Sequence, residues 1–288
     1  METLVQSLVS GALTGSLYAM IGVGLTVVFG VMRIINLAHG EMVMLGMFGA
    51  FWGQALWRLD PFLSLLLWAP LMFVAGMAVY RFLLRRIVPG GELNTLLYTA
   101  GLSLLLANVA LLLWSGDYRT ISLPYGGEPL RPLGISIPVP LVIAFSLAVA
   151  ITSALWGLLT KTDLGRAIRA TSQNAEAAIL MGVDVERVAI VTFGLGTALA
   201  AAAGVLLAPS LYLYPTVGEL LIVKCFVIVV LGGLGSVPGA IAGGVLLGVV
   251  ESLGAVYVSS TYKDGIGFVL FLAVLLYRPA GLFGVGRS

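Results

Sequence analysis

The sequence contains little charge for its length. Of its 288 residues only 10% are Asp, Glu, Lys or Arg, whereas 60% are hydrophobic. Soluble domains carry roughly 25% charged residues, so this chain has too few polar residues to cover a globule of its size. A hydrocarbon core of about 30 Å is crossed by roughly 20 apolar helical residues, and several continuous stretches reach that length. The composition therefore predicts an all-α, polytopic transmembrane helical bundle.

Cysteine and histidine are almost absent. The single cysteine, Cys225, excludes an internal disulfide and a cysteine-cluster metal site. The single histidine, His39, cannot complete an H-E-x-x-H zinc motif, and no Pro-Cys-x-x-Cys follows it as in zinc deaminases. The chain also has no G-x-x-x-x-G-K-[ST] loop that could cradle ATP. We therefore expect no metal, no cofactor and no catalytic site, and a net charge of +2 gives no reason to expect nucleic acid.

Nine apolar runs divide the sequence, and we expect each to form a membrane segment. They cover about 5–31, 40–57, 62–80, 93–114, 138–160, 187–208, 220–231, 237–258 and 265–278. The first is long for one crossing and the seventh is short, so one or both are candidates for a broken or re-entrant helix, and the count is eight to ten. We treat 1–288 as one transmembrane domain with two related halves, at about 1–114 and 138–288.

Basic residues gather in alternate connections between these runs. They concentrate near 81–86, at 161–187 and near 278–287, whereas the connections 115–137, 209–219 and 259–264 carry few of them. Cytoplasmic loops of membrane proteins carry an excess of Lys and Arg. The pattern therefore predicts an N-terminus outside, a C-terminus in the cytoplasm and an odd number of crossings, for which nine fits.

The longest cytoplasmic loop, 161–186, contains the signals of a short capped helix. Asn174 can cap its N-terminus, and Glu176 then lies in the first turn, where the helix dipole favours an anion. Gly182 stands where a glycine would end the helix. So short a helix is marginal alone in water, so its apolar residues need a surface, either on the chain's own bundle or on a partner. These residues are Ala175, Ala178 and Ile179.

Residues of this loop carry a resemblance to known proteins. "EAAILMG" resembles the E-A-A-x-x-x-G core of the cytoplasmic loop of bacterial ABC importer permeases, although the Ile-x-Leu-Pro of the fuller pattern is missing from "VTFGLG". In that superfamily the loop forms a coupling helix that inserts into the ATPase subunit. The resemblance implies that role for the residues Asn174, Ala175, Glu176, Ala177, Ala178, Ile179 and Gly182.

Several further segments narrow the family. "INLAHGE", "AAAAGVLLAP", "LGGLGSVPGAIAGGVLLGVVESL" and "TYKDGIGFVLFLAVLLYRPAGLFG" are similar to permeases of high-affinity branched-chain amino acid importers, in particular to the H-type permease of the Leu/Ile/Val system. The resemblance spans nearly the whole chain and keeps the order of the motifs. Urea and short-chain amide importers use closely similar permeases, so the substrate is less narrowly defined than the family.

Two breaks with polar or small residues interrupt the apolar sequence, at 35–41 and at 232–239, and the helix-breaking residues of the second mark a turn or an unwound segment. Polar groups in a bilayer need partners, so the first break forms either an interfacial turn or part of a protein-enclosed path. Both breaks lead into a glycine-punctuated helix, and half-helix N-termini in transporters can offer backbone N–H groups to anionic solutes. We hypothesise that both flank the translocation path, and we expect the chain to have no cluster of opposed charges. The residues concerned are Asn36, His39, Gly40, Glu41, Gly232, Gly233, Gly235 and Ser236.

The resulting prediction is a permease subunit that translocates branched-chain amino acids while a partner subunit hydrolyses ATP. A urea or amide permease and, from a different class, an ion-coupled carrier or channel are the alternatives. The resemblance implies ABC ATPase subunits, a related second permease subunit and a periplasmic or extracellular substrate-binding protein as partners. It places the chain, surrounded by lipid, in a bacterial inner membrane.

Overall fold

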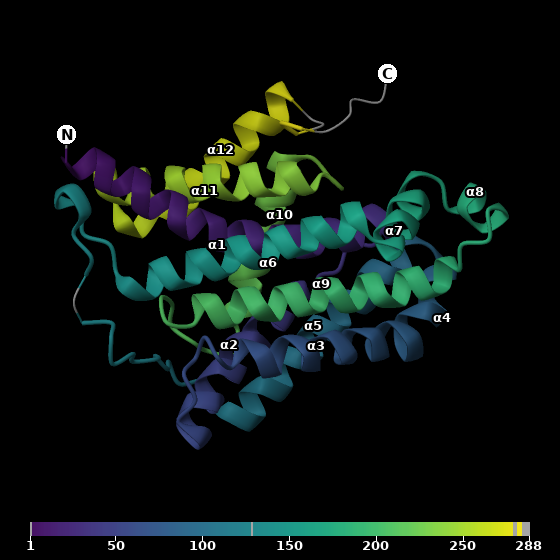
Figure 1. Cartoon of the computed structure of the whole chain (residues 1–288), viewed down its shortest axis with the longest axis horizontal. Coiled ribbons are helices and arrows are strands. Elements are labelled where there is room, and N and C mark those ends of the chain that lie inside the picture. The colour runs from purple at the N-terminus through teal and green to yellow at the C-terminus, as the bar shows by residue number, and fades with distance from the viewer. Residues whose placement is uncertain (1, 128, 279–280, 284–288) are drawn as a thin grey trace.

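The computed structural model describes residues 2–127, 129–278 and 281–283 as a bundle of helices (Figure 1). Within those ranges strand-like pairing is limited to two isolated bridges. A π-helical turn at Tyr80–Leu84 joins α3 to α4. The helices are α1 (Glu2–Met32), α2 (His39–Trp57), α3 (Leu65–Val79), α4 (Arg85–Ile87), α5 (Glu92–Trp114), α6 (Val139–Lys161), α7 (Asp163–Gln173), α8 (Ala175–Leu180), α9 (Val185–Leu207), α10 (Val217–Gly232), α11 (Val237–Tyr257) and α12 (Lys263–Tyr277).

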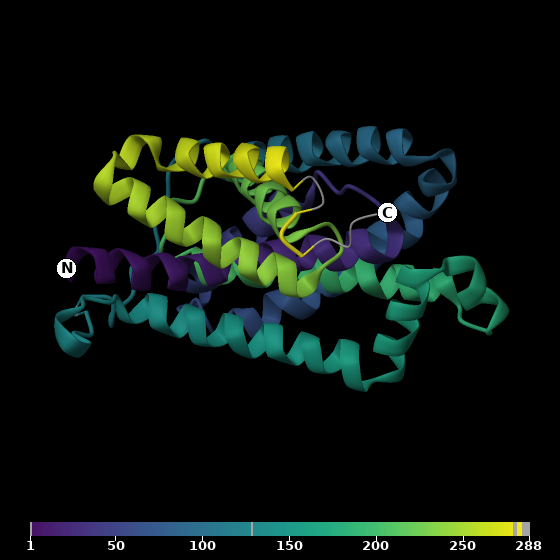
Figure 2. The same ribbon diagram turned by 90° about the horizontal axis from the view of Figure 1, so that it is seen from above.

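Each of the nine predicted apolar runs lies on one of these helices, which confirms the all-α membrane bundle. Seven segments are long and apolar enough to cross a membrane, and they contain α1, α3, α5, α6, α9, α11 and α12. The other two long helices, α2 and α10, fall outside that group. Figure 2 shows the long helices running roughly along one axis, with α10 lying obliquely among them. The first run proves to be one unbroken helix of 31 residues, so only the short seventh run fits the expectation of an incomplete crossing.

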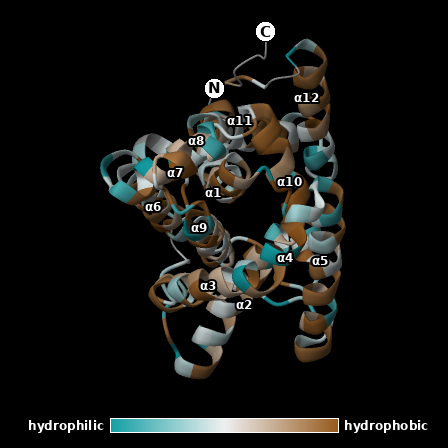
Figure 3. Cartoon of the chain, turned by 90° about the vertical axis from the view of Figure 1, so that its right-hand side faces the viewer, coloured by the Kyte–Doolittle hydropathy of each residue, from teal (hydrophilic) through white to brown (hydrophobic). Residues whose placement is uncertain are grey.

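The centre of the bundle is formed by α1 and α9. Between 17 and 28 nearly all residues of α1 are buried, and so is most of α9. Small residues let the backbones approach closely: a Cβ on Gly15 would lie 2.7 Å from the carbonyl oxygen of Gly244 in α11. By contrast, hydrophobic residues cover the outer faces of α5 and α12 (Figure 3). An apolar exterior around a packed centre is what a lipid-embedded bundle requires.

The glycine-rich break at 232–239 is a tight turn between α10 and α11. Gly233 and Gly235 have φ angles of 96° and 85°, which L side chains rarely adopt. The Ser236 hydroxyl accepts a hydrogen bond from the Gly239 N–H at 3.1 Å and so caps α11. The prediction of a turn is therefore confirmed. Backbone atoms of Gly235 would lie 3.7 Å from a Cβ on Gly30, so the turn sits against the last part of α1.

Candidate functional site

The predicted coupling loop is a helical elbow at one end of the bundle. Its tip is α8, which projects beyond the other helices in Figure 1. The side chain of Asn174 accepts a hydrogen bond from the Ala177 N–H at 3.0 Å, so the predicted N-cap is present. Gly182 follows with a φ of 82°, the left-handed conformation expected of a glycine that ends a helix.

The apolar residues of α8 divide into a buried and an exposed set. Ala178 is 4% exposed, and α8 contacts α7 and α9, so this residue packs on the chain's own bundle, the first of the two alternatives. Ile179, Leu180 and Met181 are 58%, 87% and 84% exposed. Ala175, Glu176 and Ala177 are exposed as well. We call Ile179–Met181 the apolar tip, because these three adjacent apolar side chains are exposed at an end of the bundle rich in charge.

One helix of this elbow was missed by the sequence analysis. Asp163–Gln173 forms α7, capped by Thr162, whose hydroxyl accepts a hydrogen bond from the Gly165 N–H at 3.0 Å. Ile168 and Thr171 face inward on it. The signal was available, since the Thr162 cap is followed by apolar residues at helical spacing. Because α7 is helical, α8 stands on a structured arm.

The base of the elbow is tied to the neighbouring helices. An ion pair joins Arg85 in α4 to Glu186 in the first turn of α9, with 2.9 Å between Nη2 and Oε2. Asp184 caps α9 by accepting a hydrogen bond from the Arg187 N–H at 3.0 Å. The elbow is therefore fixed to α9, one of the two central helices of the bundle.

The N-termini of α2 and α10 meet at mid-height in the bundle. A Cβ on Gly40 would collide with the carbonyl oxygen of Gly218, so only glycine fits there. The Glu41 carboxylate lies against Gly218, and its Oε1 accepts a hydrogen bond from the Ser103 hydroxyl at 3.3 Å. Ser103 is the middle residue of α5. Two helices separated by long stretches of sequence thus begin side by side near the centre of the bundle.

The carboxyl group of Glu41 lies where the positive ends of two helix dipoles meet. It is 1% exposed, lies in the first turn of α2 and touches the first turn of α10. A carboxylate at a helix N-terminus is stabilised by the dipole. Its Oε2 atom has no hydrogen-bond partner among the described residues. A carboxyl group of the chain itself thus lies at the position where half-helix N-termini were expected to face a solute.

His39 lies close to the same level, against the middle of α1. Its Nε2 is 3.1 Å from the carbonyl oxygen of Ile21, and the residue is fully buried. A Cβ on Gly24 would lie 3.1 Å both from the imidazole and from the carbonyl oxygen of Gly196, the middle residue of α9. The imidazole therefore fills the space between three chain segments at the centre of the bundle.

The non-helical stretch before α2 is satisfied inside the protein. Asn36 is 1% exposed, and its side-chain oxygen accepts a hydrogen bond from the Ala38 N–H at 3.1 Å. The Thr99 hydroxyl donates to the carbonyl oxygen of Ile35 at 3.1 Å. Irregular backbone at membrane depth is tolerated where protein groups satisfy it. Asn36, His39, Gly40 and Glu41 thus form one buried group, as their sequence proximity suggested.

The other half of the predicted path group lies elsewhere. Gly232, Gly233, Gly235 and Ser236 belong to the break before α11, where Gly235 sits beside Gly30, which is nine residues, or about 13 Å along α1, from Ile21. The structural counterpart of the 35–41 break is the stretch 208–216 before α10. Its Leu213 pairs with Arg119 of the 115–137 connection through two backbone hydrogen bonds of 2.9 Å. The sequence signal for it was the shortness of the seventh apolar run.

A cluster of opposed charges joins α10, α11 and α12, and the expectation that the chain has none is wrong. The Lys224 ammonium donates hydrogen bonds to Glu251 and, at 2.7 Å, to Asp264. It also lies 5.0 Å from the ring centroid of Tyr18 in α1. Lys224 and Glu251 are 7% and 6% exposed. Lys224 is 27 positions from Glu251 and 40 positions from Asp264 in the sequence, so only the tertiary fold brings the three residues together.

No group of three or more His, Cys, Asp or Glu side chains suited to a metal ion occurs in the part of the chain that the structure describes. Cys225 is fully buried and free.

Comparison with known proteins identifies the family. Residues 7–275 match the family described as the permease component of branched-chain amino acid transport systems. The chain is 35% identical to the permease protein BraD of Pseudomonas aeruginosa over 97% of this chain and 95% of the relative. It is 34% identical to LivH of Salmonella typhimurium and 32% identical to LivH of Escherichia coli, each over 97% of this chain and 95% of the relative. All three are named as high-affinity branched-chain amino acid transport system permease proteins.

No solved structure matches the chain. The family match covers all nine long helices from the second turn of α1 to near the end of α12, so it includes the elbow and the buried centre together. The resemblance of the sequence motifs to H-type permeases is confirmed by these relatives. The chain is therefore a multi-pass membrane protein that belongs to the family of permease components of branched-chain amino acid transport systems.

Proposed function

We propose that this chain is the membrane permease of an ABC importer for branched-chain amino acids. The observation that carries the proposal is the family match, which spans residues 7–275. The named function of the relatives supports this substrate over urea or short-chain amides and over an ion-coupled carrier. ATP is bound and hydrolysed on a partner ATPase subunit, because the sequence has no P-loop of its own.

The apolar tip of α8 is the proposed contact with that ATPase. Its three exposed side chains project from the bundle on a capped, structured arm. Burying them in a groove would remove apolar surface from water, which favours association at about 25 cal/mol per Å². Glu176, exposed in the first turn of α8, is placed to pair with a basic residue of the ATPase. Closure of the ATPase pair then moves α8 and, through α7 and α9, the centre of the bundle.

The elbow end faces the cytoplasm in this proposal. Arg85, Lys161, Arg169 and Arg187 lie on α4, α6, α7 and α9 near the elbow, and the excess of basic residues there follows the positive-inside rule. Figure 1 shows the start of α1 at the opposite end of the bundle, so this proposal has the N-terminus outside. The connections 115–137 and 209–216 then face a substrate-binding protein in the periplasm or outside the cell.

The half-helices α2 and α10 are the proposed moving parts of the translocation path. Their N-termini touch at mid-height through Gly40 and Gly218, with the Glu41 carboxylate between them and Ser103. Separating them would open a passage lined by backbone N–H groups, His39 and one carboxylate. The pairing of two discontinuous segments near the midplane is typical of transporters. A second, related permease subunit is the proposed partner across the path.

The test is ATP-driven uptake by the complex reconstituted in vesicles with its ATPase, second permease and binding protein. We expect concentrative uptake of leucine that requires ATP, with much slower uptake of alanine and none of urea. Uptake of urea in preference to leucine would replace the substrate with an amide. Uphill leucine uptake by the permease alone would overturn the proposal.

A further inference from the structure

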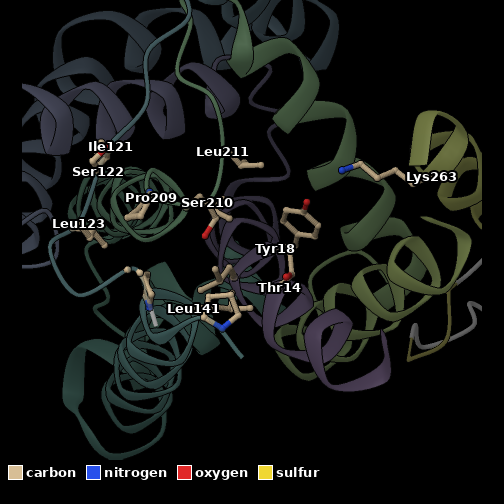
Figure 4. A pocket seen from close by; sticks show the side chains of 16 residues that line it. Thr14, Tyr18, Ile121, Ser122, Leu123, Leu141, Pro209, Ser210, Leu211 and Lys263 are labelled. Atoms are coloured by element: carbon tan, nitrogen blue, oxygen red, sulfur yellow. The ribbon is translucent and has the colours of Figure 1, made fainter. Parts of the chain in front are cut away.

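A cavity of about 690 Å³ opens at the end of the bundle opposite the elbow (Figure 4). Its wall combines α1, the 121–127 part of the long connection, the first turn of α6, the 207–211 turn after α9 and the start of α12. Volumes of about 300–1,000 Å³ are usual for small-molecule sites. Because five segments far apart in the sequence build the wall, the cavity is a product of the fold and not of one loop.

The lining is apolar on one side and polar on the other. Leucine, isoleucine and proline side chains from the loops and α6 form the apolar side, and Figure 4 places Ile121 and Leu123 across the cavity from Lys263, with Leu141 nearer to Thr14. The polar groups are the Lys263 ammonium and the hydroxyls of Thr14, Tyr18, Ser210 and Ser122, of which Ser122 lies beside Ile121. In Figure 4 the Lys263 side chain extends toward Tyr18. A solute with one anionic end and one aliphatic end matches this division.

The charge of Lys263 is available to a ligand. No carboxylate among the described residues lies within ion-pair distance of its ammonium. The adjacent Asp264 is instead bonded to Lys224, at 2.7 Å. Lys224 in turn holds the Tyr18 ring, whose centroid is 5.0 Å away. The charge cluster therefore fixes one polar wall of the cavity and leaves the Lys263 cation to face it.

The geometry points to a binding site for an aliphatic α-amino acid in this cavity. Lys263 receives the α-carboxylate, the hydroxyls of Ser210 and Thr14 accept hydrogen bonds from the ammonium, and the side chain lies among Ile121, Leu123 and Leu141. The inference rests on the proposed function and adds to it an outer holding site within this one subunit. A single lysine and a few hydroxyls make it weak, so a solute handed over there is released readily to the path.

The test uses cysteine protection in the assembled transporter, without binding protein, in lipid nanodiscs. Cys225 is fully buried, so the parent protein gives a low background with a maleimide. Ser122→Cys places one exposed thiol in the cavity wall without touching a proposed ligand contact. Leucine at about ten times its Kd should slow the labelling of this thiol about tenfold, because a ligand competes by a factor of 1 + [L]/Kd. Leucinamide, which lacks the carboxylate, should not slow it.

Further variants assign the effect to Lys263. Adding Lys263→Gln to Ser122→Cys should abolish protection by leucine, and Lys263→Arg should preserve it. Lys161→Gln, which removes a lysine at the elbow end, is the matched control and should leave protection unchanged. Equal protection by leucinamide, protection that survives Lys263→Gln, or protection by octanoate but not leucine would each overturn the inference. ATP-driven leucine uptake by the parent complex tests the proposed function separately, so the two failures are distinguishable.

Discussion

Replacing Lys224 with methionine should destabilise the folded permease strongly. The substitution keeps the aliphatic volume but removes the ammonium that bonds Glu251 and Asp264. Glu251 is 6% exposed, so its carboxylate would remain buried without a cation. Breaking a buried ion pair from one side costs about 3–5 kcal/mol. The side chain of Asp264 is 38% exposed and screened by solvent, so it adds little to that figure.

A second substitution separates the ion pair from the packing. In Lys224→Met/Glu251→Leu no buried charge is orphaned, and apolar replacement of a buried pair is often neutral or stabilising. We therefore expect the double variant to recover most of the loss, with a coupling energy of about 3 kcal/mol or more in a double-mutant cycle. The assay is reversible denaturant unfolding in mixed micelles. A loss below about 1 kcal/mol in Lys224→Met, or a double variant no more stable than the single one, would refute the reasoning.

Three further predictions concern the elbow and the centre. Asn174→Ala removes the cap of α8 and should cost about 1 kcal/mol, measured as faster amide exchange in α8; unchanged exchange would contradict the role of the cap. Gly40→Val should lower the melting temperature, because the added Cβ would collide with Gly218. Gly157→Val is the control and should not lower it, because nothing lies within 4 Å of the added Cβ. Equal effects of the two substitutions would contradict the close approach of α2 and α10. Ala178→Trp should lower stability by about 1–3 kcal/mol through overpacking, and a normal melting temperature would show that this side of α8 is open.

The fold could be predicted largely because the membrane imposes continuous apolar runs on the sequence. All nine runs lie on helices, and the caps at Asn174, Asp184 and Ser236 are where short-range chemistry indicates. Capping and turn formation depend on residues within four positions of each other, so they can be read locally. The helix α7 was not predicted, because its polar composition is typical of a loop, although the Thr162 cap could be read from the sequence.

The centre could be predicted only in part, because its contacts are long-range. The group from Asn36 to Glu41 was found by sequence proximity alone. Its partner at Gly218 was not found from the sequence, because the conspicuous glycines at 232–239 suggested that segment as the counterpart of the first break. The charge cluster was missed for the same reason: Lys224 reaches Glu251 and Asp264 across separate helices. Residue type indicates that a buried charge needs a partner, but the fold decides which one.

The most direct test of the account is the effect of Leu180→Glu on coupled transport. Leu180 is 87% exposed in the apolar tip, so the substitution spares the fold and places a charge where an ATPase groove is proposed. The control is Thr160→Glu, which places an equal charge on α6 at the same end of the bundle. For both variants the assay measures ATP-driven leucine uptake and the amount of ATPase subunit retained on the vesicles. The account predicts that Leu180→Glu loses both while the control keeps both. Full uptake by Leu180→Glu would contradict the claim that α8 receives the driving force.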